Sequence, residues 1–171
     1  MLDTYKFIEK YKRISIIGME KNVGKTTLLN KLIADIGKNK KLGLTSIGRD
    51  GEDIDVVTNT DKPRIYVRRG SIIATGRNCL TKCDITKEIL YVTDFTTPMG
   101  SIVIVRALSD GYVDIAGPSY NKQVKIVVEL MEKFGSEISI VDGALGRKST
   151  AISDVSEATI LSTGAALSLD M

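Results

Sequence analysis

The stretch Ile14-Ser-Ile-Ile-Gly-Met-Glu-Lys-Asn-Val-Gly-Lys-Thr-Thr-Leu-Leu-Asn30 decides the fold of this chain. It begins as a short apolar strand, continues into a loop with a glycine at each end, and then opens a helix with Lys25-Thr26-Thr27. A strand, a glycine-bounded loop and a helix in this order are typical of a phosphate-binding loop, or P-loop. Gly24 has no Cβ, so the backbone there can curl closely around a phosphate group.

Each part of this loop has an expected role. Successive backbone amides would hold phosphate oxygens, and the positive end of the helix would add to the attraction. We expect the Lys25 ammonium to lie between the outer phosphates, where it also serves catalysis, and the Thr26 hydroxyl to coordinate Mg²⁺. The predicted phosphate-binding residues are Gly18, Glu20, Lys21, Asn22, Val23, Gly24, Lys25, Thr26 and Thr27.

The size and composition of the chain narrow the possible functions. Its 171 residues, 43% of them hydrophobic, suit a single domain with one core. A net charge of +3 is too small to indicate a nucleic-acid-binding protein. The chain has no histidine, which excludes nucleophiles activated by histidine. Cys79 and Cys83 are expected to be free thiols in a cytoplasmic protein, and no apolar run is long enough to predict a membrane span.

Three acidic positions lie within or directly after expected strands and are candidates for holding Mg²⁺. Asp50 lies in the acidic loop after the strand 42–47, at a strand end where open α/β sheets bind ligands. Asp114 belongs to the strand 112–118, and Asp142 follows the apolar run 137–141. Asp114 and Gly117, three residues later, resemble in type and spacing a carboxylate and a glycine of many P-loop proteins; this resemblance implies that Asp114 binds the metal through water and takes part in catalysis and that Gly117 senses the terminal phosphate. Asp142 is the rival metal ligand.

The remaining pattern predicts an α/β fold of three layers, a P-loop NTPase with a mostly parallel sheet and an antiparallel hairpin insert. A helix after the P-loop should bury Leu28, Leu29, Leu32, Ile33 and Ile36 and end at Gly37, and a second helix is expected over 124–134. Two hairpins are expected, one pairing 64–67 with 71–75 and one pairing 102–107 with 112–115. The other expected strands are 13–17, 42–47, 89–93, 137–141 and 158–161.

The end of the chain also carries an expectation. Residues 164–171 look like the opening of a helix that is cut short. We therefore expect residues 1–171 to be a single nucleotide-binding domain that is a truncated piece, or the first part, of a longer protein.

Five residues separate Gly18 from Gly24, one more than in the commonest P-loop. This longer loop resembles those of dethiobiotin synthetase and the cobyric acid synthases, which belong to the same branch of P-loop proteins as the nitrogenase iron protein and MinD. The resemblance implies an ATP-binding and Mg²⁺-binding protein. It departs from MinD at Glu20, which stands where MinD-type loops have an additional lysine, while Lys21 comes one place later.

Three segments together resemble one narrower family. They are 18–27, 114–119 and 140–149, the last followed by Ala158-Thr-Ile-Leu-Ser-Thr-Gly-Ala-Ala166. They are similar to the small P-loop subunits encoded with clostridial-type lysine 5,6- and ornithine 4,5-aminomutases. This resemblance implies an ATPase that acts with a second, MutS-like ATPase subunit to reactivate the cobalamin-dependent aminomutase. The expected partners of the chain also include a second copy of itself, as a homodimer.

Three functions remain open from the sequence. The first is an ATPase whose hydrolysis changes the conformation of a protein partner. The second is an ATP-dependent ligase or small-molecule kinase of the dethiobiotin synthetase type. The third is a module that binds nucleotide without turnover. ATP is favoured over GTP because the chain has no guanine-recognition motif; Thr60-Asp-Lys-Pro63 lacks the order of one.

Overall fold

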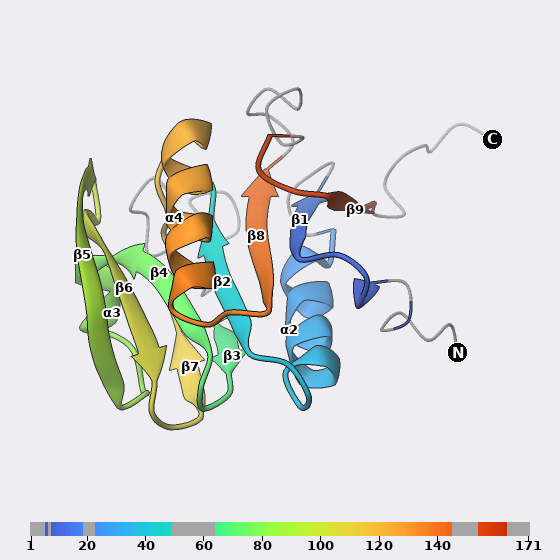
Figure 1. Cartoon of the computed structure of the whole chain (residues 1–171), viewed down its shortest axis with the longest axis horizontal. Coiled ribbons are helices and arrows are strands. Elements are labelled where there is room, and N and C mark those ends of the chain that lie inside the picture. Colours follow the sequence, from blue (N-terminus) through green and yellow to red (C-terminus); the bar gives the residue numbers. More distant parts are fainter. Residues whose placement is uncertain (1–5, 7, 19–22, 49–63, 145–153, 164–171) are drawn as a thin grey trace.

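The computed structural model describes residues 6, 8–18, 23–48, 64–144 and 154–163. Within these residues the chain forms one seven-stranded sheet and one two-stranded sheet, with helices packed against the larger one (Figure 1). The strands are β1 (Arg13–Gly18), β2 (Leu42–Ser46), β3 (Ile65–Val67), β4 (Ile72–Gly76), β5 (Lys87–Thr97), β6 (Gly100–Ala107), β7 (Gly111–Val113), β8 (Ile138–Ala144) and β9 (Ala158–Ser162). The helices are α2 (Lys25–Ile36), α3 (Arg77–Leu80) and α4 (Asn121–Lys133).

The seven-stranded sheet is mostly parallel, as the sequence predicted. Its strand order is β5-β6-β4-β2-β8-β1-β9, and the five strands from β4 to β9 run parallel to one another. β6 and β5 extend this sheet as an antiparallel pair. In Figure 1 the arrowheads of β1, β2 and β8 point toward the same edge of the sheet, and the N-terminal end of α2 begins beside β1.

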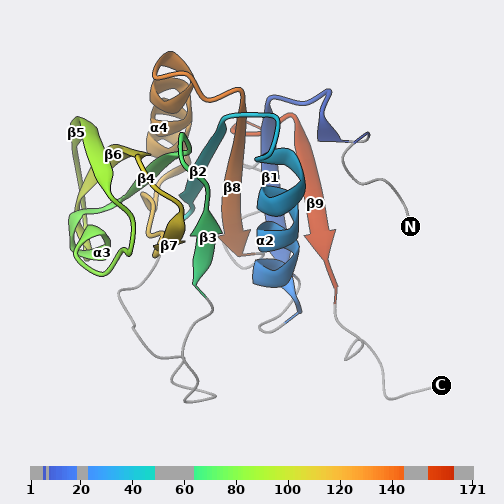
Figure 2. The same cartoon turned by 90° about the horizontal axis from the view of Figure 1, so that it is seen from below.

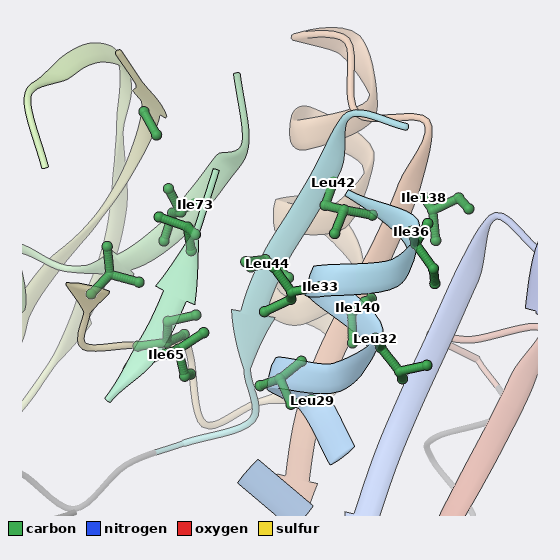
Figure 3. Close-up of a cluster of buried hydrophobic side chains, with 14 of the residues drawn as sticks. Leu29, Leu32, Ile33, Ile36, Leu42, Leu44, Ile65, Ile73, Ile138 and Ile140 are labelled. Carbon is green, nitrogen blue, oxygen red and sulfur yellow. The ribbon is translucent and has the colours of Figure 1, made fainter. Parts of the chain in front are cut away.

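The two long helices cover opposite faces of this sheet (Figure 2). Helix α2 buries the predicted stripe of Leu29, Leu32, Ile33 and Ile36 against one face, while Leu28 is only partly buried. The helix ends at Gly37, as expected, and the Gly37 amide donates to the Ile33 carbonyl. Figure 3 shows these side chains meeting Leu42, Leu44, Ile138 and Ile140 of the adjacent strands.

Helix α4 covers the other face. Its buried residues Val124, Val127, Val128 and Met131 pack in a second hydrophobic cluster with alternate residues of the same strands. The end of α4 is fastened to the start of β1, because Arg13 Nε and Nη2 donate to the two carboxylate oxygens of Glu132 at 2.7 and 2.8 Å. This hydrogen bonding raises the pKa of Arg13. The fold is therefore α/β, with one helix layer on each face of a central sheet.

Both predicted hairpins are wrong in their pairing. β3 does not pair with β4; it pairs antiparallel with β7, with Ile65 opposite Val113. β4 instead enters the large sheet between β2 and β6. β6 does not pair with β7, and the hairpin insert is formed by β5 and β6. All five residues of β4 are buried, which is the pattern of an interior strand and not of an exposed hairpin.

The second edge of β3 is occupied by a side chain of α2. The Asn30 amide nitrogen donates to the Arg64 carbonyl at 3.3 Å, and Asn30 Oδ1 accepts from the Tyr66 amide at 3.1 Å. The side chain of Asn30 thus pairs with the β3 backbone in the way that a neighbouring strand would. It attaches the two-stranded sheet to the middle of α2.

The segment after β7 fits between the ends of β4 and β2. The Gly76 amide donates to the Ala116 carbonyl, and the Gly48 amide donates to the Pro118 carbonyl, both at 2.9 Å. Between these two bonds the Gly117 amide donates to Ser46 Oγ at 2.9 Å. In the described part of the chain, no helix combines the length and the apolar character needed to cross a membrane.

Gly117 is required by this packing. A Cβ at Gly117 would lie 1.8 Å from the Ser46 carbonyl oxygen, whereas a Cβ at the equally buried Gly143 would find its nearest neighbour at 3.6 Å. We therefore expect Gly117→Ala to lower the free energy of unfolding by roughly 2 kcal/mol or more, because backbone must move. Gly143→Ala, the matched control, should change it by less than about 1 kcal/mol. Urea denaturation of the two variants measures the difference, and equal stabilities would contradict the steric argument.

Candidate functional site

The candidate site lies where the carboxyl ends of β1 and β8 meet. These strands are parallel neighbours, with Ile16 opposite Asp142 and Ile17 opposite Gly143. The chain leaving β1 passes through α2 to β2 on one side, and the chain leaving β8 reaches β9 on the other. Such a reversal of direction is the point at which open α/β sheets form a ligand-binding crevice.

Gly24 sets the turn of the backbone directly before α2. It has a φ of +78°, the left-handed region that a glycine adopts without strain. It also occupies the position just before the helix, where most helices carry a side chain that caps the first amides. Gly24 provides no such cap, and the first turn of α2 contains no acidic residue. The positive end of α2 therefore meets no negative group of its own helix, an arrangement suited to binding an anion.

Lys25 extends from this helix end to β8. Its ammonium lies 3.0 Å from Asp142 Oδ1 and donates a hydrogen bond of 2.9 Å to the Gly143 carbonyl. Both side chains of the ion pair are largely buried, with 26% of Lys25 and 20% of Asp142 exposed. The sequence predicted a role for each residue but not that they would pair.

β9 also contributes to the loop. Ser162 Oγ donates to the Val23 carbonyl at 2.6 Å, which fixes the peptide that leads into Gly24. Sequence reasoning missed this residue. Its position at a strand end could have indicated a role at the site, because Ser162 is the last residue of β9 and pairs in register with Gly18 at the end of β1.

Asp114 lies elsewhere along the same edge of the sheet. It follows β7, outside the seven-stranded sheet, and its carbonyl accepts a hydrogen bond from Thr75 Oγ1 of β4 at 3.1 Å. β2 separates β4 from β8, so two strand spacings, about 10 Å, lie between this position and Asp142. Asp142 is thus the predicted carboxylate that the fold brings to Lys25, and the role of Asp114 stays a prediction.

Gly117 is closer to this centre. Its amide bonds to Ser46, which is the register partner of Asp142. The packing of Gly117 against Ser46 accounts for a glycine at this position, and its predicted role in sensing a terminal phosphate stays a prediction. Glu20, Lys21, Asn22 and Asp50 lie outside the described residues.

The residues at this centre suit a magnesium ion that is shared with phosphate groups. Within the described residues, no group of three or more acidic or cysteine side chains could hold a metal by itself. Mg²⁺ in nucleotide sites typically takes one or two protein oxygens and obtains the rest from water and phosphate. The Asp142 carboxylate and the Thr26 hydroxyl, one residue after Lys25, are of the required type.

The two cysteines are both free and lie in α3 and in the segment that follows it. Cys79 is buried in α3, and Cys83 Sγ donates to the Cys79 carbonyl at 3.2 Å. Burial raises the pKa of the Cys83 thiol, which makes it a poor nucleophile at neutral pH.

Comparisons of the chain with protein-family profiles, curated proteins and solved structures find no match.

The left-handed conformation of Gly24 gives a testable result for the protein without ligand. Gly24→Ala should lower the free energy of unfolding by about 1 kcal/mol, because an L-residue is strained at this φ. A Cβ there would meet nothing within 4 Å, so no clash adds to the cost. Gly24→Asn should cost less, since asparagine tolerates this conformation better. Thermal unfolding without nucleotide makes the comparison, and an alanine variant as stable as the wild type would show that the loop does not need a glycine.

Proposed function

We propose that this chain is a P-loop ATPase of the branch that includes dethiobiotin synthetase and MinD. It binds Mg²⁺-ATP at the carboxyl ends of β1 and β8 and uses hydrolysis to change the conformation of a protein partner. The second ATPase subunit or the cobalamin-dependent aminomutase implied by the sequence resemblance is the proposed partner, and the cytoplasm the proposed compartment.

The observation that carries this proposal is the placement of Lys25. A lysine in the first turn of α2, directly after a left-handed glycine, reaches across the carboxyl edge to the aspartate of the adjacent strand. Gly24, the uncapped start of α2 and the Lys25 ammonium lie next to one another, and a helix start and an ammonium both supply the positive charge that a polyphosphate requires. The start of α4 also has no side-chain cap and no acidic residue in its first turn, so the ammonium beside Asp142 is what distinguishes the start of α2.

The Lys25–Asp142 pair also suggests how the site responds to its ligand. When phosphate oxygens surround the ammonium, Lys25 no longer needs Asp142 and the Gly143 carbonyl as partners. The carboxylate is then available to a magnesium ion near the phosphates, together with the Thr26 hydroxyl. The ion would neutralise charge on the phosphates and orient them for transfer.

Two variants of this pair test the proposal by calorimetric titration with ATP. Lys25→Ala should weaken ATP binding by about 100-fold, because it removes a charge-assisted contact to phosphate. Lys31→Ala, the matched control, removes an exposed lysine of the same helix that pairs with Asp35 and should leave the affinity unchanged. Asp142→Asn should bind ATP without Mg²⁺ at least as tightly as the wild type, because the competing carboxylate is gone, yet lose the gain that Mg²⁺ gives. Equal affinities for Lys25→Ala and the wild type would overturn the proposal.

Turnover measurements on the wild-type protein distinguish the three possible functions. Phosphate release that rises when the proposed partner is added supports the ATPase. Turnover that requires a small carboxylic acid would instead favour the ligase or kinase, for which no residue of the described structure provides a specific argument. Tight binding of nucleotide with no hydrolysis under either condition would show that the chain is a module that binds nucleotide without turnover.

A further inference from the structure

β5 exposes apolar side chains at one end of the large sheet. It is the first strand in the sheet order, and Figures 1 and 2 show it as the outermost strand at the end opposite β9. Within the described residues it pairs with β6 alone. Ile89, Tyr91 and Val92 are 63%, 46% and 54% exposed. Long edge strands with exposed apolar residues are sites for pairing with another strand.

A bulge in β5 changes the face to which its side chains point. Opposite residues of an antiparallel pair point to the same face. Ile89 is opposite Val105 and Val92 is opposite Val103, and both valines belong to the cluster under α2. Tyr91, however, is opposite Ile104, which belongs to the cluster under α4, and Leu90 packs against that cluster too. Leu90 and Tyr91 therefore share one face, and Ile89 and Val92 share the other.

This distribution of side chains over the two faces of β5 allows the strand to pair with β5 of a second copy of the chain. An antiparallel pairing with the two-fold axis between Leu90 and Tyr91 sets Leu90 opposite Tyr91 of the second copy and Ile89 opposite Val92. Each of these pairs joins side chains from the same face. A shift by one residue would set Ile89 opposite Tyr91 or Leu90 opposite Val92, which point to opposite faces. A pairing centred on Asp94 would keep the faces matched but set two aspartates side by side and leave Ile89 unpaired.

The charges favour the same pairing. The same pairing sets Lys87, two residues before Ile89, opposite Asp94 of the second copy, two residues after Val92. Lys87 is opposite Ala107 and so lies on the face of Ile89. A second register shift falls between Val92 and Thr96, but Phe95 packs against the cluster under α4, so its exposed neighbour Asp94 points to the other face, that of Val92. No ion pair of Lys87 or Asp94 occurs within the described part of the chain, whereas Glu88 pairs with Arg106 at 2.7 Å.

We propose that two copies of this chain dimerise by antiparallel pairing of β5 about an axis between Leu90 and Tyr91. The pairing joins two seven-stranded sheets into one continuous sheet and covers Ile89 and Val92 on one face. It does not depend on the nucleotide site, so Lys25→Ala should dimerise like the wild type.

Analytical ultracentrifugation over a range of concentrations tests this dimer. The wild type should be dimeric, and Val92→Lys, at an exposed position, should weaken dimerisation by about 10-fold or more. Lys87→Asp and Asp94→Lys should each weaken it, because like charges become opposite one another, whereas the variant carrying both changes should recover it. A wild type that stays monomeric, or a dimer unaffected by Val92→Lys, overturns the proposal.

Cross-linking tests the register even where a charged variant is unstable. With cysteines in place of Ile89 and Val92, oxidation should link two chains, because the two positions face each other across the axis. Cysteines in place of Ile89 and Tyr91 lie on opposite faces and should link far less. The native thiols interfere little, since Cys79 is buried and Cys83 has a raised pKa. Equal cross-linking of both variants, or capture of a different protein strand by β5 in place of a second copy, contradicts the proposal.

Discussion

The parallel pairing of β1 with both of its neighbours is the constraint on which the site depends. β1 is buried and lies between β8 and β9, and its register sets Ile16 opposite Asp142 and Gly18 opposite Ser162. Once those pairs form, the end of β8 and the end of β9 are placed on either side of the chain that leaves β1. The Lys25–Asp142 ion pair and the Ser162–Val23 hydrogen bond are consequences of this register. A slip of one residue would turn Asp142 to the other face of the sheet and remove it from Lys25.

The Lys25 ammonium is held by contacts within the protein. An ammonium that is mostly buried needs oxygen atoms around it, and without a ligand the protein supplies them from β8. Lys25 is therefore already oriented toward β8 without a ligand, and this preorganisation would favour a compact anion at the proposed site.

Much of the fold was readable in the sequence because local signals agreed with it. The apolar stripe of α2, its end at Gly37 and the short apolar strands before Lys25 and Asp142 all predicted their elements correctly. The pairing of strands was not readable. Three residues between two strands suggested a hairpin over 64–75, yet β3 and β4 belong to different sheets, and only the burial of β4 on both faces distinguishes the two outcomes. The same limit applies to the carboxylates. Asp114 and Asp142 have similar sequence contexts, and which of them lies beside Lys25 depends on strand order, which involves contacts between residues more than 100 positions apart.

The hydrogen bonds between the Asn30 side chain and the β3 backbone couple α2 mechanically to the two-stranded sheet. Asn30 lies one helical turn after Thr26, so the helix that begins at the candidate site is also the element that holds the free edge of the small sheet. Any rotation or axial shift of α2 would pull on the Tyr66 backbone before it affected β7. The amide hydrogen of Tyr66 is shielded from exchange with solvent by one side chain of α2. Its hydrogen-exchange rate therefore reports whether α2 is packed against β3.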